Sequence, residues 1–199
     1  MRNFTDLITA YAWTKDAADK RALGDQIWRW YGVNRAVLVV DLCGFSRRSK
    51  DAVGILEFLA VIRRMQAAAL PVIWDNDGEV VKMEADNCFA VFERAESAAL
   101  AAQALIRASQ QIRKLDGLEL EMCCGIEWGE ILYLKEEDFF GDAVNTAARL
   151  GEDLADADQI LIGPAIRTLL TSKGWSITDY DHARAPVGVG MIDPARDDD

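Results

Sequence analysis

The sequence predicts an α+β fold in which helices lie on a mostly antiparallel sheet, with a ferredoxin-like β-α-β-β-α-β core and an N-terminal helical lead-in. Three observations predict it. The continuous apolar run at 36–40 is typical of a central strand covered on both faces. Two long segments, about 51–70 and 95–115, carry apolar residues at helical spacing. Between them, 79–92 contains two strand-like segments separated by turn residues.

Each element predicted in the first half of the chain rests on a local pattern in the sequence. Residues 1–31 carry aromatic and aliphatic side chains at near-helical spacing, which favours a helix packed on its own domain; a dimer contact is the alternative. The central strand ends at Asp41. The first long helix follows, and Pro71 with the turn-forming residues at 75–78 is expected to close it. The next two strands form a tight hairpin that turns at Asp86.

The second half continues the alternation of strands and helices. We expect a second hairpin formed by 118–128 and 130–134, with Gly129 at its turn. A helix should then run from Gly141 to about residue 154, with Asp142 as its N-cap. The remaining predicted elements are a strand at 160–162, a helix at 164–171 and a strand at 175–180.

Composition and charge limit the classes of function. The 199 residues include 22 basic and 33 acidic side chains, so the formal net charge is 22 − 33 = −11. This balance argues against binding to a nucleic-acid polymer, which needs clustered Lys and Arg. It is compatible with a nucleotide held by metal ions and backbone N–H groups. The hydrophobic content of 51% excludes wholesale disorder, and the length suits one domain.

The sequence also indicates a cellular compartment. No apolar run reaches the ~18 residues of a membrane span, and no signal peptide is evident, so we expect a cytoplasmic chain without a membrane segment.

The cysteine and histidine content argues against a zinc site. The four cysteines form no C-x-x-C pair and the chain has one His, which makes a zinc site improbable. Buried free thiols are the favoured interpretation, with a redox role as the alternative. His182 is expected to be incidental, since no orienting partner is visible.

Two carboxylates are expected to converge at one edge of the sheet. Asp41 ends the buried strand, where a carboxylate is costly unless it caps a helix, is paired or binds a metal ion. Asp86 lies at the tip of the first hairpin, which lies beside that strand in a ferredoxin-like sheet. Two carboxylates with no nearby His suit Mg²⁺ or Mn²⁺. Gly44 would let the backbone turn beside Asp41 and expose N–H groups to a phosphate.

Other elements carry amide and basic side chains that suit a phosphorylated sugar. Asn145 and Arg149 lie four residues apart on a helix that begins after a glycine, so they share a face and suit a sugar oxygen and a phosphoryl oxygen. A solvated polar face is the alternative for this pair. Lys82 alternates with Val81 and Met83, so we expect it on the opposite face of its strand from both.

Taken together, four segments resemble the catalytic domain of class III nucleotide cyclases, over about residues 35–170 of this sequence. They are 39–46 (VVDLCGFS), 81–86 with 89–92 (VKMEAD and FAVF), 124–130 (CGIEWGE) and 140–150 (FGDAVNTAARL). The order and spacing of the segments carry the resemblance, since each motif alone is weak. The resemblance makes 32–193 the expected catalytic domain, between a lead-in at 1–31 and an acidic, disordered tail at 194–199.

The resemblance implies a role for each matching residue. Asp41 and Asp86 match the two metal-binding aspartates, and the backbone carbonyl of Leu42 a further ligand, for two Mg²⁺ or Mn²⁺ ions per site. The other implied roles are substrate binding by Gly44, Phe45 and Ser46, base selection by Lys82 and Asp138, ribose orientation by Asn145 and transition-state stabilisation by Arg149.

The implied activity is that of an adenylate cyclase, which converts ATP to 3′,5′-cyclic AMP and pyrophosphate at sites shared across a homodimer. Lys82 and Asp138 point to ATP, because guanylate-specific members typically carry Glu and Cys at these positions. A cyclase for GTP or a pyrimidine nucleotide is one alternative. A catalytically silent module that binds a nucleotide or a partner is another. The chain departs from the family pattern at Ala85, where Gly is usual, and lacks a convincing C-terminal Lys for the triphosphate.

Overall fold

The computed structural model of the chain describes residues 3–43, 52–116, 120–135 and 137–194. Of the predicted tail at 194–199, only the first residue lies within these ranges. In the described part of the chain, no helix is long and apolar enough to cross a membrane.

One twisted sheet organises the fold, and its central strand is β1. The strands lie in the order β2-β3-β1-β4-β6-β8-β7, and β5 pairs with β4. In the described part of the chain, all strand pairings are antiparallel except that of β4 with β6. The strands are β1 (Gly32–Leu42), β2 (Gly78–Glu84), β3 (Asn87–Phe92), β4 (Met122–Leu134), β5 (Asp138–Phe140), β6 (Ile160–Ile162), β7 (Thr178–Asp179) and β8 (Gly190–Ile192).

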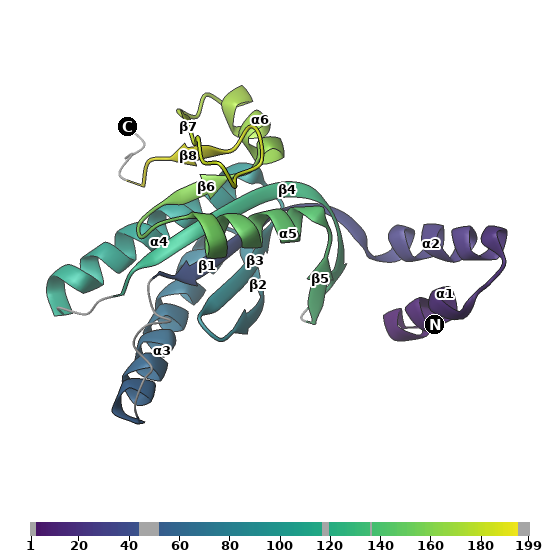
Figure 1. The fold of residues 1–199 in the computed structure, drawn as a ribbon, viewed down its shortest axis with the longest axis horizontal. Coiled ribbons are helices and arrows are strands. Elements are labelled where there is room, and N and C mark those ends of the chain that lie inside the picture. The colour runs from purple at the N-terminus through teal and green to yellow at the C-terminus, as the bar shows by residue number, and fades with distance from the viewer. Residues whose placement is uncertain (1–2, 44–51, 117–119, 136, 195–199) are drawn as a thin grey trace.

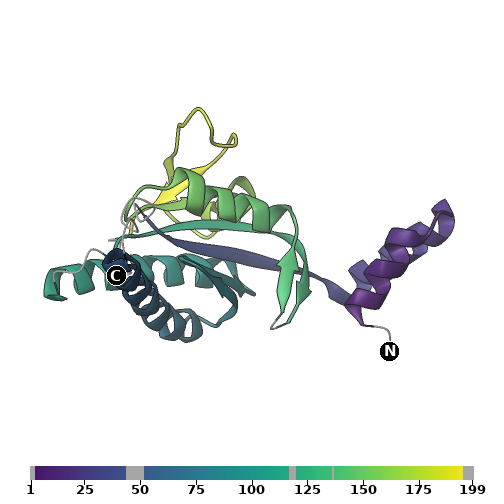
Figure 2. The same cartoon turned by 60° about the horizontal axis from the view of Figure 1, so that its bottom comes forward.

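The helices cover both faces of this sheet (Figures 1 and 2). Helices α3 (Ala52–Asp75) and α4 (Ala95–Asp116) lie on one face, and α5 (Asp142–Ala148) with the π-helix η2 (Arg149–Leu154) lies on the other. Helix α6 (Pro164–Ser172) packs near β6 and β8. The order β1-α3-β2-β3-α4-β4 confirms the predicted ferredoxin-like α+β core.

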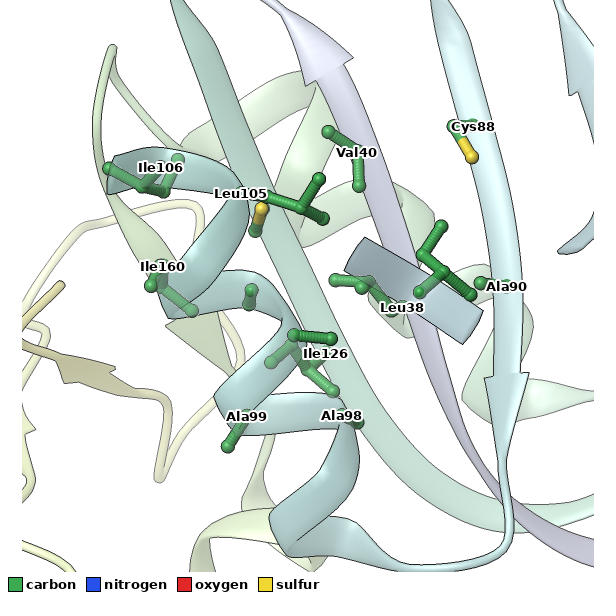
Figure 3. Close-up of a cluster of buried hydrophobic side chains, with 14 of the residues drawn as sticks. Leu38, Val40, Cys88, Ala90, Ala98, Ala99, Leu105, Ile106, Ile126 and Ile160 are labelled. Carbon is green, nitrogen blue, oxygen red and sulfur yellow. The ribbon is translucent and has the colours of Figure 1, made fainter. Parts of the chain in front are cut away.

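The main core lies between the sheet and helices α3 and α4. Leu38 and Val40 of β1 face Leu105 of α4, and the small residues Ala98 and Ala99 let that helix approach the sheet closely (Figure 3). Every residue from 36 to 40 is fully buried. The apolar run therefore forms the doubly covered central strand that the sequence predicts.

The predicted helical lead-in forms two helices, α1 (Phe4–Trp13) and α2 (Ala17–Tyr31), which extend away from the sheet (Figures 1 and 2). They pack on each other through buried Leu7 and Ile27. The Phe4 ring lies 5.1 Å from the Tyr31 ring and 6.3 Å from the Phe140 ring on β5, measured between centroids. The lead-in thus contacts its own domain, while Trp13 is 82% exposed.

The predicted second hairpin is wrong, because β4 is one continuous strand from Met122 to Leu134. Gly129 lies inside it and pairs with Arg35 rather than forming a turn. A Cβ at Gly129 would lie 3.0 Å from the Cβ of Ala143, so the glycine lets α5 approach the sheet. The actual turn follows Leu134 and leads into β5, which pairs back onto the end of β4.

Other element boundaries also differ from the predictions. Helix α3 continues through Pro71 to Asp75, because Ile73 is buried on the core side of the final turns. Gly141, not Asp142, is the N-cap of α5, with no side-chain hydrogen bond to the helix. The helix predicted to residue 154 becomes a π-helix from Arg149. Strand β7 is shorter than predicted, and β8, which was not predicted, pairs with both β6 and β7.

Candidate active site

A cleft of about 550 Å³ lies at the end of the sheet where β1 terminates. Asp41 enters it from β1 and Asp86 from the turn between β2 and β3. The β1–β3 register explains their meeting, since Val40 pairs with Cys88 and the ends of both strands therefore coincide. The structure brings these two carboxylates to one cleft, as the sequence predicts. The described residues that line it are Asp41, Leu42, Cys43, Asp86, Asn87, Glu121, Glu152, Ala155, Asp156 and Ala157.

The described residues that line the cleft carry an excess of negative charge. Five of the described lining residues are acidic and none is basic. Burial raises the pKa of Asp41 to about 7, and the charges of Asp86 and Glu152 add to that shift, against a hydrogen bond with the Leu42 backbone that lowers it. These carboxylates repel one another in the absence of a counter-ion. The donor set therefore fits a divalent cation that prefers oxygen ligands.

The cleft is not a complete cage of protein ligands. Among the described residues, no group of three or more His, Cys, Asp or Glu side chains is close enough to hold a metal ion. Asp41 and Asp86 both line the cleft, with the Leu42 backbone beside them. Mg²⁺ commonly takes one or two carboxylates and completes its coordination with water and substrate phosphates.

Glu152 was missed by the sequence-based prediction. It lines the cleft from η2, and burial together with Asp153, Asp86 and Glu84 raises its pKa. The π-helical turn sets its direction, and the acidic run at 152–158 was the signal available in the sequence. Glu152 adds negative charge from the helix that also carries Asn145 and Arg149.

Lys82 and Asp138 form an ion pair, with 3.1 Å between Nζ and Oδ1. The Lys82 Nζ also lies 3.6 Å from Glu84 and 5.4 Å from the centroid of the Phe89 ring. Burial alone would lower the pKa of Lys82, but the hydrogen bond and charge of Asp138, with those of Glu84, raise it above its ordinary value. Two residues 56 positions apart in the sequence (138 − 82) thus meet on β2 and β5.

The face on which Lys82 lies differs from the simple alternation predicted. A β-bulge between Val80 and Lys82 shifts the register, so that Lys82 pairs with Phe89. Val81 and Phe89 belong to the same cluster on the α5 side of the sheet, and Lys82 reaches the Phe89 ring there. Lys82 therefore shares a face with Val81, and the bulge directs its ammonium group to Asp138.

Asn145 and Arg149 lie on the exposed side of the helix formed by α5 and η2, one turn apart. The Arg149 guanidinium donates a hydrogen bond to the backbone carbonyl of Arg184. Neither residue lines the acidic cleft, and neither do Lys82 and Asp138. The structure therefore places the candidate residues in separate parts of the chain: two carboxylates in one cleft, the ion pair on β2 and β5, and two exposed polar side chains on a helix.

Glycines fix the position of that helix over the sheet. A Cβ at Gly125 of β4 would lie 2.1 Å from the Ala147 carbonyl oxygen and 2.4 Å from the Gly151 backbone nitrogen. The backbone of η2 and that of β4 are thus in direct contact, which only glycine at 125 permits.

Four further residues considered in the sequence analysis are not among the described residues that line the cleft. Gly44, Phe45 and Ser46 lie outside the described residues. His182 stacks on Tyr180 at 6.0 Å between ring centroids, and its Nδ1 accepts a hydrogen bond from the Arg184 backbone. This local contact agrees with an incidental histidine.

Comparison with known proteins finds nucleotide cyclases among the similar sequences and structures. No family model matches the chain. A protein of Rhizobium meliloti (strain 1021) named "Putative adenylate cyclase 3" is 30% identical over 153 residues, which is 73% of this chain and 24% of that protein. The structure of an adenylate/guanylate cyclase/hydrolase from Silicibacter pomeroyi superimposes with a TM-score of 0.65 at 26% identity, covering 83% of this chain and 99% of the other.

A more distant structure shares the fold alone. The monomeric guanylyl cyclase domain of the RhoGC fusion protein from the aquatic fungus Blastocladiella emersonii gives a TM-score of 0.68 at 17% identity, over 80% of this chain and 94% of that domain. In fold, and over part of its sequence, the chain resembles class III nucleotide cyclase domains. It spans about a quarter of the length of the curated relative it matches.

The raised pKa of Asp41 predicts a stability cost that depends on pH. In the unfolded chain the pKa of Asp41 has its ordinary value of 3.8, whereas in the folded chain it is about 7. Asp41 therefore lowers the free energy of unfolding as pH rises between these values. In metal-free buffer, Asp41→Asn should raise the free energy of unfolding at pH 8 by on the order of 2 kcal/mol, allowing for partial solvent access, and by much less at pH 4.

Urea unfolding with a chelator at both pH values measures this difference. Asp25→Asn, at an exposed position on α2, is the matched control and should change stability little at either pH. An equal effect of Asp41→Asn at pH 4 and pH 8 would contradict the electrostatic origin of the cost.

Proposed function

We propose that the chain is an adenylate cyclase domain that converts ATP to 3′,5′-cyclic AMP and pyrophosphate. One observation carries the proposal: Asp41 and Asp86 converge on an acidic cleft that no described basic residue lines, in a chain that resembles class III nucleotide cyclase domains. A silent binding module would have no evident need for this arrangement, since the crowded carboxylates are costly without a cation.

The metal ligands in this proposal are the carboxylates of Asp41 and Asp86 and the backbone carbonyl of Leu42. Two Mg²⁺ or Mn²⁺ ions bound there would supply Lewis acids that lower the pKa of the ribose 3′-hydroxyl and offset the charge of the triphosphate. Glu152 adds negative charge to the cleft and so raises its affinity for cations.

The chain's other residues bind and orient the nucleotide. Asn145 hydrogen-bonds to the ribose and holds it so that the 3′-oxygen faces the α-phosphorus. The 3′-hydroxyl loses its proton to water. As the bond from the 3′-oxygen to the α-phosphorus forms, the bond from the α-phosphorus to the bridging oxygen breaks and pyrophosphate leaves. Arg149 donates to the phosphoryl oxygens, where negative charge develops, and exchanges its hydrogen bond with Arg184 for this contact.

Lys82 and Asp138 read the base. Adenine presents a ring nitrogen that accepts a hydrogen bond beside an amino group that donates one, and a lysine and a carboxylate match that order. The 3.1 Å contact between the two side chains supports this role, because it holds the donor and the acceptor side by side. Guanine presents an accepting oxygen beside a donating ring nitrogen. A guanylate cyclase is the runner-up, since the fold neighbours include guanylyl cyclases.

The active site is shared between two copies of the chain in this proposal. The carboxylates open into the cleft of their own chain, whereas Asn145 and Arg149 are exposed on the surface of α5 and η2. One copy would supply the metal-binding residues and the other the base-reading, ribose-orienting and transition-state residues. A C₂ dimer would then contain two complete sites.

The first prediction concerns the product. Incubated with an equimolar mixture of ATP, GTP, CTP and UTP and with Mn²⁺, the full chain should yield cyclic AMP as its main cyclic product. Asp41→Ala should lower turnover by about 100-fold or more, since metal and transition-state contacts of this kind contribute several kcal/mol. Mass spectrometry identifies the products, and Asp25→Ala on α2 is the control that keeps activity.

Each outcome of this assay has a distinct meaning. Cyclic GMP as the main product would keep the reaction and overturn the assignment of the base. No cyclic product from a folded dimer that binds Mn²⁺ would overturn the proposed activity.

The second prediction concerns base selection. The double variant Lys82→Glu with Asp138→Cys removes the donor and acceptor for adenine and should change the ratio of kcat/KM for ATP to that for GTP by about tenfold or more in favour of GTP. Lys135→Glu is the control, because the Lys135 ammonium pairs with Glu79 at 3.9 Å. An unchanged ratio in the double variant would show that these side chains do not read the base.

The third prediction tests the shared site. Asp41→Ala and Arg149→Ala chains should each be inactive alone, whereas an equal mixture should recover about a quarter of the parent activity. Half of the dimers formed by random exchange are mixed, and each mixed dimer holds one intact site of two. Activity is measured after the chains have exchanged. Failure to recover any activity, although mixed dimers are detected by native mass spectrometry, would contradict the shared site.

A further inference from the structure

Two cysteines flank Asp41 on the same face of the sheet. Cys123 of β4 pairs directly with Asp41 of β1. Cys43 follows β1, and its backbone N–H donates to the Glu121 carbonyl over 2.9 Å, which continues the ladder by one step. Because side chains alternate along both strands, Asp41, Cys43 and Cys123 all point to the α5 side of the sheet. The cysteines are diagonal neighbours across the strand pair.

The contacts of the Cys123 thiol place it between the cleft and the helix. Its Sγ lies 3.3 Å from the Gly151 carbonyl oxygen, 3.7 Å from the Asp41 carbonyl oxygen and 4.0 Å from Asp41 Oδ2. A hydrogen bond with Cys43 is the largest of the causes that raise the pKa of Cys123 far above its ordinary value. Independently of that shift, the strand register places the two thiols on the same face as diagonal neighbours.

The two thiols differ in access to solvent. Cys43 is half-buried and lines the cleft, so a small solute can reach it. Cys123 is 1% exposed and is reached through Cys43. The other two cysteines, Cys88 and Cys124, lie in the core on the opposite face of the sheet.

We propose that Cys43 and Cys123 form a reversible disulfide that switches the Asp41 site off, a regulation that rests on the proposed function for its effect on turnover. A peroxide is the oxidant. The sulfur of Cys43 attacks the O–O bond and becomes a sulfenic acid, and one water leaves. The sulfur of Cys123 then attacks that sulfur, its proton goes to the departing oxygen, and a second water leaves. Two thiols are oxidised and one peroxide is reduced.

The bridge requires the backbone to move. Diagonal neighbours lie about 7 Å apart at Cα, whereas a disulfide usually spans about 4.4–6.8 Å. Cys43 lies beyond the last residue of β1, and Leu42 is the last residue fully within the strand ladder. Movement of Cys43 toward Cys123 therefore changes the end of β1, and Asp41 and the Leu42 carbonyl lie within that end.

The bridge alters Asp41 in two ways. It removes the thiol hydrogen of Cys123 that approaches the Asp41 carboxylate, and it draws the backbone after Leu42 toward β4. Both changes displace ligands of the proposed metal site. Oxidation should therefore weaken Mn²⁺ binding and lower turnover together, and a dithiol reductant should restore both.

The experiment treats the full chain with a small excess of hydrogen peroxide and then with dithiothreitol. Mass spectrometry of a digest made under non-reducing conditions should find a peptide that joins Cys43 and Cys123 and is lighter by two hydrogens than the separate thiols. Mn²⁺ binding, measured by electron paramagnetic resonance with the metal alone, should weaken about tenfold on oxidation and recover on reduction. Cyclase turnover should follow the same course.

Matched variants separate the switch from general oxidative damage. Cys43→Ser should form no such peptide and should keep the same Mn²⁺ affinity before and after peroxide. Cys88→Ser, a change in the core on the opposite face, should behave as the parent chain does. If Cys88→Ser folds poorly, Cys124→Ala serves the same purpose, because Cys124 also faces away from Asp41.

The outcomes distinguish failure of the switch from failure of the proposed function. Absence of the joined peptide, or its formation without any change in Mn²⁺ binding, would overturn the switch. A joined peptide with reversible loss of Mn²⁺ binding supports the switch even if no nucleotide is turned over, and only the proposed activity is then contradicted.

Discussion

The continuous ladder between β1 and β4 is the constraint on which the rest of the molecule depends. It pairs every residue of β1, from Gly32 to Leu42, with a residue of β4. At one end it sets Asp41 opposite Cys123, and at the other end β4 continues into the turn that leads to Asp138 on β5. A one-residue slip would move Asp41 to the face that packs against α3 and α4. The doubly buried run at 36–40 prevents such a slip, since each side chain already fits one of two cores.

Buried carboxylates on this sheet are stabilised in two different ways. Glu127 of β4 is 6% exposed, and its carboxylate accepts hydrogen bonds from the backbone N–H groups of Trp128 at 2.8 Å and Ile166 at 2.9 Å. It thereby fastens the start of α6 to the sheet, although burial still raises its pKa. Asp41 has acidic neighbours in place of such a set of donors. The first arrangement belongs to a structural residue, and the second leaves a charge that a bound cation would satisfy.

The sequence alone predicted the fold class, because the apolar run at 36–40 and the two helical periodicities are local signals that the core preserves. It also predicted that Asp41 and Asp86 converge at one edge of the sheet, and the resemblance to the cyclases paired Lys82 with Asp138 in base selection. The roles of these residues remain predictions. Three features of the structure could not be predicted from strand and helix periodicity. They are the bulge beside Lys82, the continuous path of β4 through Gly129 and the π-helix after Arg149. Each depends on contact with a distant segment, so no local pattern encodes it.

The irregularity after Arg149 links the two halves of the proposed site. Along η2, Arg149 is exposed and Glu152 lines the cleft, and Gly151 lies between them against Gly125 of β4. A residue larger than glycine at 125 would push this segment away from the sheet, because the clash is with backbone atoms that cannot rotate aside. Any such movement would shift Glu152 relative to the carboxylates of its own chain. In the proposed dimer it would also shift Arg149 relative to a nucleotide bound in the shared site. A single backbone contact would therefore couple the acidic cleft of one proposed site to Arg149 in the other.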